Sequence, residues 1–347
     1  MLRVTADGLP ARAALAKRPA LPAVITGTVT AWPAWRAWTW QYLQRALAGV
    51  DLYCGDDEQG DEVLASIDEV IIGQGSDAYI FDDMFHITVP ELLPAFRAPA
   101  ACSEHDLLAV LPDIEQAAQQ DCTSRPPWRW LLIGGAGTGS ALHVDPLGTC
   151  AWNACIRGIK LWILAPPGAQ LPALGEQTSA GAWWSSLAVQ SSHTACHQTS
   201  RGIANTVQAC IARSGQSHRA PLPGLPALDA VPHAGLQERA CLVNAWHASQ
   251  GGTRALACRV PGMTRAGGPL LALLQVPGQI VAIPAGWQHA VLNVTRSVAV
   301  TQNYLQPSHA AEALRQLQRE APADAAALRA AWHQAGLRFH RGCFEDG

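Results

Sequence analysis

The chain has 347 residues, of which 49% are hydrophobic and 15% charged, so it can bury a large core as one large domain or two average ones. Its formal net charge of −3 gives no support for binding to nucleic acid or to an anionic membrane surface. No apolar run approaches the roughly 20 residues that a membrane-spanning helix needs, and the N-terminus lacks the apolar block of a signal peptide. The ten cysteines form no CxxC pair. We therefore expect an intracellular protein with reduced thiols, either nuclear or cytoplasmic.

Residues 1–125 alternate short β-branched runs with short amphipathic segments, which predicts a region of strands and helices that packs on the main body. Thr39 is suited to begin a helix, because its hydroxyl can accept a hydrogen bond from a free N–H of the first turn. Tyr79 lies in a short strand that ends in the acidic pair Asp82 and Asp83. We expect strands at 22–30, 51–53 and 78–82, helices at 39–48, 104–111 and 113–119, and a helical or mixed segment at 63–73.

A strand at 126–133 and a glycine-rich segment at 134–139 follow. This segment leads into a strand and not into a helix with Lys-Ser/Thr, so we interpret it as a flexible turn and not as a phosphate loop. The next stretch, ALHVDPLGTCAWNACIRGIKLW at 141–162, carries the first candidate site residues. In an extended strand, His143 and Asp145 face the same side, as two ligands of a metal would.

A lysine follows in the second apolar run of this part, which we predict to be a strand at 156–166. Lys160 is one of only two lysines in a chain with 24 lysines plus arginines. A flexible ammonium group is a good partner for a buried carboxylate. The lysine therefore marks a candidate anion-binding position.

The stretch VPGQIVAIPAGWQHAVLNVTRSVAVTQNY at 276–304 offers a third ligand, His289. Two histidines and one carboxylate with open positions form the facial triad of non-haem Fe(II) oxygenases. Short strands with Gly/Pro turns, flanked by helices, predict a mainly β fold of the double-stranded β-helix (cupin or jelly-roll) type at 126–306. Residues 307–347 read as C-terminal helices that buttress the barrel or form a homodimer face. We expect strands at 270–276, 279–284, 289–294 and 297–302, and helices at 309–319 and 322–335.

The segment at about 189–267 has almost no acidic residues and no hydrophobic periodicity. A loop of this length without structure of its own is uncommon in a compact domain. We interpret it as an insertion that interrupts the barrel, either a disordered loop or an error in the gene prediction such as a retained intron. It holds several histidines and cysteines, but no pair has zinc-finger spacing, so a zinc module is a lesser alternative.

The two site-bearing stretches resemble the JmjC-domain 2-oxoglutarate oxygenases. They are most similar to the subgroup of the bifunctional arginine demethylase and lysyl hydroxylase once described as a phosphatidylserine receptor. The runs HVDPLGTCAWNACIRGIKLW and PAGWQHAVLN…AVTQNY match that subgroup nearly position for position. The upstream runs WPAWRAWTW, DAYIFDDMF and PPWRWLLIGGAGTGSALHVDP are also similar. The resemblance covers most of the chain outside 189–267 and implies the JmjC barrel.

The resemblance implies that His143, Asp145 and His289 bind Fe(II), and that 2-oxoglutarate and O₂ take the three remaining positions. Lys160 and Thr301 would bind the distal carboxylate of 2-oxoglutarate. Four side chains would contact this cosubstrate in all: Lys160, Thr301, Asn153 and Tyr79.

The implied reaction converts 2-oxoglutarate to succinate and CO₂ and hydroxylates a C–H bond of a protein segment that contains arginine or lysine. An N-methyl group would then leave as formaldehyde, whereas a lysine would stay hydroxylated. Two alternatives remain open: a non-catalytic interaction protein with the JmjC fold, and a metal-dependent cupin enzyme of another class. Lys160 and Thr301 argue against the second, because such an enzyme needs no anchor for a dicarboxylate.

Overall fold

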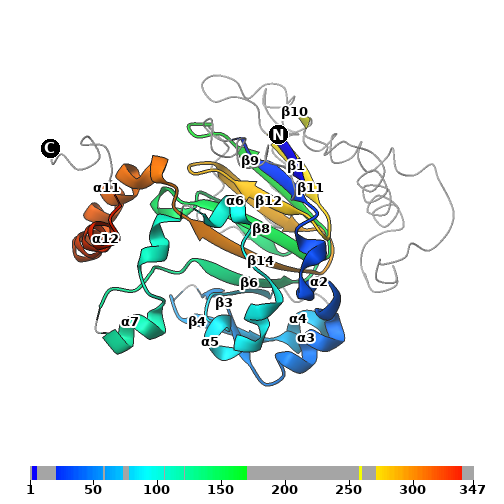
Figure 1. Cartoon of the computed structure of the whole chain (residues 1–347). Helices are drawn as coiled ribbons and strands as arrows, with labels where there is room; N and C mark the ends of the chain where they lie inside the picture. Colours follow the sequence, from blue (N-terminus) through cyan, green and yellow to red (C-terminus); the bar gives the residue numbers. More distant parts are fainter. Residues whose placement is uncertain are drawn as a thin grey trace.

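The computed structural model describes residues 2–5, 21–57, 59–72, 78–104, 106–120, 122–169, 258–259 and 271–337. Two β-sheets form the centre of the molecule, and helices lie at its periphery (Figure 1). Apart from residues 258 and 259, the predicted insertion at 189–267 lies outside the described residues. Within the described residues, no helix combines the length and the hydrophobicity needed to span a bilayer.

Among the described residues, the larger sheet has seven strands in the order β1-β2-β12-β8-β14-β6-β5, and the smaller has five in the order β10-β11-β9-β13-β7. All neighbouring strands are antiparallel except β1 and β2. A separate hairpin pairs β3 with β4. The bounds are β1 Leu2–Thr5, β2 Ala23–Thr26, β3 Asp51–Asp56, β4 Glu62–Ser66, β5 Tyr79–Asp82, β6 Arg129–Gly134, β7 Gly139–His143, β8 Cys150–Arg157, β9 Lys160–Ala165, β10 Cys258–Arg259, β11 Leu271–Gln275, β12 Ile280–Ile283, β13 Gln288–Asn293 and β14 Ser297–Tyr304.

Short helices of the N-terminal half pack on one face of the larger sheet, and two longer helices follow β14 (Figure 1). Thr39 begins α3 as predicted, since its hydroxyl accepts a hydrogen bond from the N–H of Tyr42. The α-helices are α2 Pro33–Ala37, α3 Trp40–Ala46, α4 Ile67–Ile72, α5 Phe85–Thr88, α6 Ala100–Ser103, α7 Ile114–Gln120, α11 Ala310–Glu320 and α12 Pro322–Gln334. The 3-10 helices are η1 Val29–Ala31, η2 Pro90–Ala95, η3 Leu107–Val110, η4 Pro146–Gly148 and η6 Pro307–His309.

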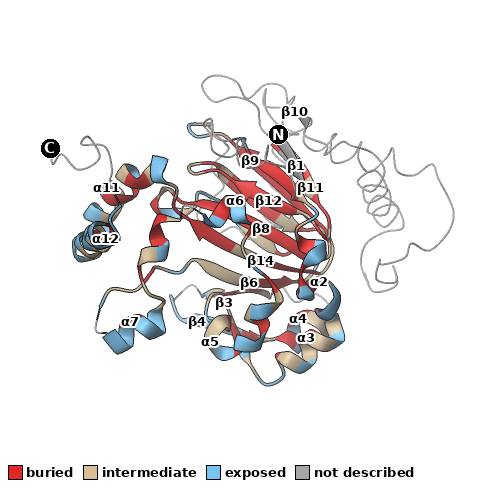
Figure 2. Ribbon diagram, in the orientation of Figure 1, coloured by how far each residue is buried: buried red, intermediate tan, exposed pale blue. Residues whose placement is uncertain are grey.

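Strand alternation divides the larger sheet into two buried faces. On β8, Trp152 and Ala154 belong to the core beneath the N-terminal helices, whereas Ala151 belongs to a core shared with the smaller sheet. Because side chains alternate along a strand, Asn153 faces the space between the two sheets. Both faces of the central strands are therefore covered, as the burial colours show (Figure 2).

The predicted mainly β architecture with flanking helices is confirmed. In the described part of the chain, no strand pairing joins the two sheets into a closed barrel. The division at 125/126 and 306/307 stays a prediction.

The predicted single strand at 156–166 is wrong, because the chain turns at Gly158 between β8 and β9. Gly158 has a φ of 81°, and a Cβ there would lie 2.3 Å from the carbonyl oxygen of Arg296. The predicted helix at 104–111 is wrong as well, since only the 3-10 turn at Leu107–Val110 forms. The segment at 63–73 is mixed as expected, with the end of β4 followed by α4.

Candidate metal centre

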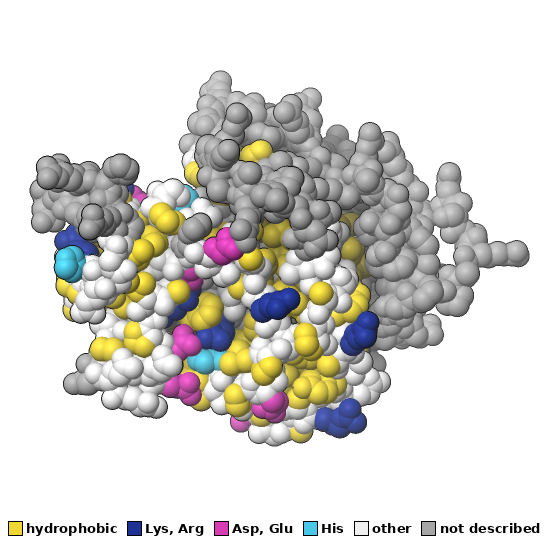
Figure 3. Space-filling model, viewed as in Figure 1, with side chains coloured by type: hydrophobic (Ala, Val, Ile, Leu, Met, Phe, Trp, Pro, Cys, Tyr) yellow, Lys and Arg dark blue, Asp and Glu magenta, His cyan; other side chains and the backbone are white. Residues whose placement is uncertain are grey.

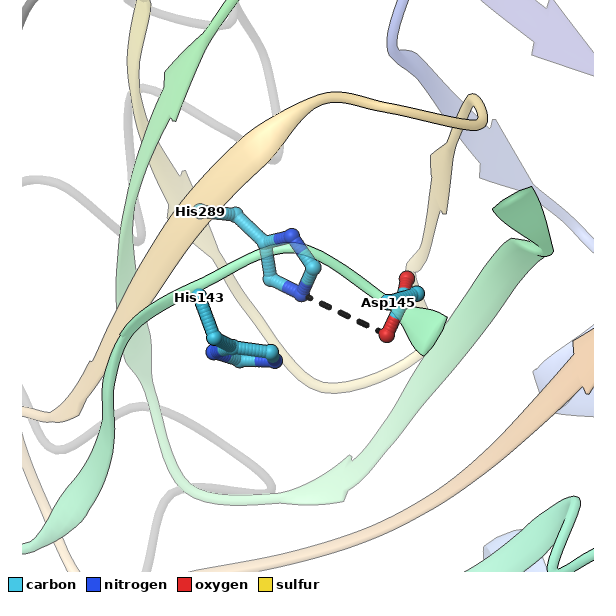
Figure 4. Close-up of side chains that lie close together, drawn as sticks. All are labelled: His143, Asp145 and His289. Atoms are coloured by element: carbon cyan, nitrogen blue, oxygen red, sulfur yellow. Dashed lines mark ion pairs between the residues drawn. The ribbon is translucent and has the colours of Figure 1, made fainter. Parts of the chain in front are cut away.

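The three predicted metal ligands meet at one edge of the smaller sheet. His143 is the last residue of β7 and pairs directly with His289 on β13. The two imidazole centroids are 4.2 Å apart, and Nε2 of His289 lies 4.0 Å from Oδ1 of Asp145 (Figure 4). One potential ligand atom from each of the three residues lies within 4.8 Å of the others. The structure therefore brings together a group that could hold one metal ion.

Asp145 does not lie in the strand that the sequence predicts. β7 ends at His143, and Asp145 directly precedes the turn η4. Its backbone is still extended, with φ −61° and ψ 138°. The side-chain alternation thus continues past the last ladder hydrogen bond, and Asp145 keeps the orientation that a strand would give it.

Backbone carbonyls fix the orientation of both imidazoles. Nδ1 of His143 lies 2.8 Å from the carbonyl oxygen of Ala141, and Nδ1 of His289 lies 3.1 Å from that of Trp287. A carbonyl oxygen only accepts, so each Nδ1 carries a proton, and in the neutral form of the ring Nε2 keeps its lone pair. This arrangement is the usual one for a metal-binding histidine.

Burial keeps His289 neutral. It lowers the pKa of His289 to about 4; the neighbouring His143 acts in the same direction and Asp145 acts against both. At neutral pH the ring is therefore in the form that binds a metal. Two imidazoles and a carboxylate on one side of an ion suit Fe(II) and leave positions open for other ligands.

Lys160 is the first residue of β9 and is fully buried. Its Nζ donates a hydrogen bond of 2.9 Å to Oδ1 of Asn293 on the neighbouring strand β13. Burial lowers the pKa of Lys160 to about 8, so the side chain is mainly protonated at pH 7. An ammonium group has three N–H donors, and Asn293 takes one of them. The geometry therefore suits an anion that would use the remaining charge and donors.

Asn293 is a site residue that the sequence reasoning missed. It is fully buried and also accepts a hydrogen bond of 2.6 Å from Ser297, while its amide donates to Thr138 at 2.9 Å. These contacts hold the acceptor that orients Lys160. The signal lay in the strand period: Asn293 comes four residues after His289 and so shares its face.

The other predicted cosubstrate contacts lie on the larger sheet. Thr301 on β14 pairs directly with Asn153 on β8, and its hydroxyl donates to the carbonyl oxygen of Trp152 at 2.9 Å. Asn153 is 4% exposed, and among the described residues its Oδ1 has no hydrogen-bond partner. A buried amide oxygen accepts, so it requires a hydrogen-bond donor, which a bound water molecule or a ligand that carries a donor would supply.

Tyr79 on β5 approaches the lysine. Nζ of Lys160 lies 5.8 Å from the centre of the Tyr79 ring. Burial raises the pKa of Tyr79 to about 12, and a hydrogen bond with Ser140 opposes that shift. The phenol is therefore neutral and able to donate a hydrogen bond to an anion bound at Lys160.

Trp162 connects the lysine to the ligand triad. Lys160, Trp162 and Leu164 alternate along β9, and the Trp162 ring lies 6.0 Å from the His289 ring. The indole N–H donates to Gln275 at 2.8 Å, which fixes the ring in place. Lys160 and His289 thus lie on the inner face of one sheet with an aromatic wall beside them.

Comparison with known proteins gives a family match over most of the chain: residues 14–310 match the cupin-like domain. Curated relatives include the bifunctional arginine demethylase and lysyl-hydroxylase psr-1 of Caenorhabditis elegans (33% identical over 158 residues) and that of Caenorhabditis briggsae (32% over 160). Each alignment covers 44% of this chain, and 37% and 38% of the respective relatives. The arginine-specific demethylase JMJ22 of Arabidopsis thaliana is 33% identical over 158 residues, which are 46% of this chain and 29% of that protein. The chain thus spans less than two fifths of each relative's length, and the resemblance to the JmjC oxygenases is confirmed.

Proposed function

Because the chain belongs to the cupin-like domain family, and its site has the donor set of a facial triad, we propose that it is an Fe(II)- and 2-oxoglutarate-dependent oxygenase. Its substrates would be arginine or lysine side chains of protein segments, with O₂ as the oxidant. The relatives named for arginine demethylation and lysyl hydroxylation support this substrate class.

One observation carries the proposal: the fully buried Lys160 lies on the same sheet face as His289. Among the described residues, its ammonium group donates one hydrogen bond, to Asn293, and so has N–H donors left for a ligand. Burying a cation without a counter-charge is costly, so a fold that keeps one gains from a bound anion. Fe(II) with 2-oxoglutarate and O₂ supplies the oxidative chemistry when bound.

The chain's own residues bind and orient the cosubstrate. The ammonium group of Lys160 would neutralise the distal carboxylate, and the hydroxyl group of Tyr79 would donate to it. The Thr301 hydroxyl would donate to it after turning away from the carbonyl oxygen of Trp152. The amide of Asn153 would lie near the metal-bound end. Trp162 closes one side of the site and limits the access of water. His143, Asp145 and His289 would hold the metal.

The same features weigh against the two alternatives. A metal-dependent cupin of another class has no use for a buried ammonium group on the sheet face that carries a metal ligand. A non-catalytic interaction protein has no need to keep three metal-ligand side chains and an anion anchor in one interior. On the face of the molecule in Figure 3, the basic and acidic side chains of the described residues lie scattered among apolar ones, without a large patch of a single sign.

The first experiment measures cosubstrate turnover. Purified protein would be incubated with Fe(II), ascorbate, O₂ and 2-oxoglutarate, and succinate would be followed by NMR. We expect succinate from the wild-type chain and none from His143→Ala. His333→Ala, which removes an exposed histidine of α12, is the matched control and should keep full turnover. A folded, iron-loaded wild-type protein that forms no succinate would refute the oxygenase.

Substrate class needs a separate measurement. Peptides that contain lysine, arginine or methylated arginine would be incubated with the active protein and analysed by mass spectrometry. A gain of one oxygen indicates hydroxylation, and loss of a methylene group with release of formaldehyde indicates demethylation. If succinate forms but none of these peptides changes, the proposed substrate class is wrong while the oxygenase stands. Residence in the nucleus or cytoplasm and a homodimer through α11 and α12 stay predictions.

A further inference from the structure

The residue two positions after Asp145 has an unusual backbone. Leu147 lies in the turn η4 with φ 56° and ψ 22°, and among the described residues it is the only one other than glycine with a positive φ. A side chain with a Cβ is unfavourable in this left-handed region. Such strain persists only where the surrounding structure fixes it, and it often marks a functional loop.

The Leu147 side chain is buried in a core that is separate from the two cores of the β-sheets. Its neighbours there come from η3 and the C-terminal helices, and η4 packs directly against α11. This core, which we call the C-terminal core, contains Leu107, Leu108, Leu111, Leu147, Leu305, Ala310, Ala313, Leu314, Leu328 and Trp332. The loop that carries Asp145 therefore contributes its one buried leucine to the helical part of the protein.

The rest of the loop leaves little freedom around this anchor. Thr149 closes the turn, because its N–H and its hydroxyl both donate to the carbonyl oxygen of Pro146, at 3.1 and 2.8 Å. Thr149 in turn accepts a hydrogen bond from Asn303 on β14 at 3.3 Å. Asp145 thus lies between the end of β7 and a turn that the packing of Leu147 in the C-terminal core holds in place.

We infer that Leu147 is a positioning residue for the metal site: its packing in the C-terminal core sets the position of the Asp145 carboxylate. This inference rests on the proposed metal site and adds that α11 and α12 support it. The strained backbone of Leu147 would hold the loop in place. If this backbone relaxed to an ordinary conformation, the loop would move, and the Asp145 carboxylate would move with it. A leucine whose role is only to fill the core would affect stability and not the affinity for the metal.

The test measures metal affinity in the full-length chain, with Co(II) as an oxygen-stable probe, by calorimetry and by the Co(II) absorption spectrum. Three variants distinguish the effect of the Leu147 side chain from the effect of its strained backbone. Leu147→Ala removes the anchor, Leu147→Gly removes the anchor and the strain, and Leu147→Met keeps an unbranched apolar anchor. Leu43→Ala is the matched control, because Leu43 is fully buried in a different core on α3. Melting temperatures are measured without metal.

We expect Leu147→Ala and Leu147→Gly to raise the Kd for Co(II) roughly tenfold, the lower end of the effect of losing a group that supports a ligand. Leu147→Met should restore the affinity, and Leu43→Ala should lower the melting temperature without changing the Kd. An unchanged Kd in Leu147→Ala, full affinity in Leu147→Gly, or an equal loss in Leu43→Ala would each overturn the positioning role. If the wild-type chain binds no Co(II), the metal site itself is refuted and this inference fails with it.

Discussion

Replacing Lys160 by methionine tests whether the buried ammonium group serves a ligand or the fold. Methionine keeps an unbranched side chain of nearly the same length and removes the charge. Burial lowers the pKa of Lys160 from 10.5 to about 8, which corresponds to about 3 kcal/mol at about 1.4 kcal/mol for each pH unit. Without a bound anion, this is the cost of keeping the lysine charged inside the folded protein at pH 7.

The direction in which the stability changes with pH follows from proton linkage. Between pH 8 and 10.5 the unfolded chain holds a proton on Lys160 that the folded chain has lost, so the stability of the wild-type protein should rise with pH in this window. Below pH 8 both states are protonated and the full cost applies. Lys160→Met should therefore be more stable than the wild type at pH 7 by up to about 3 kcal/mol, less the lost hydrogen bond to Asn293, worth about 1–3 kcal/mol.

The assay combines urea unfolding at pH 7 and pH 10 with the KM for 2-oxoglutarate. We expect Lys160→Met to unfold at higher urea than the wild type at pH 7, and the difference to shrink at pH 10. Its KM for 2-oxoglutarate should rise by about a hundredfold or more, because truncating one partner of a buried charge pair costs about 3–5 kcal/mol. Leu161→Met, at the next residue on β9, controls for repacking. It should change neither the urea unfolding nor the KM for 2-oxoglutarate. A variant that is clearly less stable at pH 7 and has the wild-type KM would show that the lysine serves the fold alone.

Three further substitutions test separate parts of the structure. Arg125→Met should destabilise the protein by about 3–5 kcal/mol in urea unfolding, because it leaves the buried carboxylate of Asp106 without its ion pair; a loss below about 1 kcal/mol would contradict this. Gly139→Ala places a Cβ 2.0 Å from the carbonyl oxygen of Val291, so it should separate β7 from β13, cost more than about 3 kcal/mol and abolish Co(II) binding; retained binding would refute the predicted clash. Tyr79→Phe should raise the KM for 2-oxoglutarate about three- to tenfold, by loss of one hydrogen bond to the cosubstrate, and should lower the stability by about 1 kcal/mol, by loss of the hydrogen bond with Ser140; an unchanged KM would place the hydroxyl outside the cosubstrate site.

The sequence was sufficient to predict that His143, Asp145 and His289 lie together, because these residues are found in short, specific runs. His143 and Asp145 are two residues apart, and the period of an extended chain predicts their common orientation. His289 comes from a distant segment, and its place beside them was expected from the resemblance. The register of β13 against β7 then explains the meeting physically, since His289 pairs directly with His143.

The partners of the candidate residues were harder to predict, because they depend on register and on local backbone angles. Asn293 meets Lys160 only because β13 and β9 pair at these two residues, and no spacing along the chain encodes that pairing. The turn at Gly158 lies inside a run of apolar residues that looks like one strand. The left-handed backbone of Leu147 could not be predicted from the sequence, because such angles are expected at glycine or asparagine.

The candidate site also explains why the polar groups of the interior are divided between the two sheets. The ligand residue His289 and the anchor Lys160 belong to the smaller sheet, whereas Asn153 and Thr301 belong to the larger one. Among the described residues, the strands of the two sheets do not pair with each other. Side-chain packing holds the sheets together, with a hydrogen bond of 2.8 Å from the Gln275 side chain on β11 to the carbonyl oxygen of Asn153 on β8. An anion bound at Lys160 that also reaches Asn153 and Thr301 would connect the sheets through hydrogen bonds. Under the proposed function, a fold of two facing sheets could thus keep a costly buried cation, because the anion that neutralises the cation would also complete the polar interior.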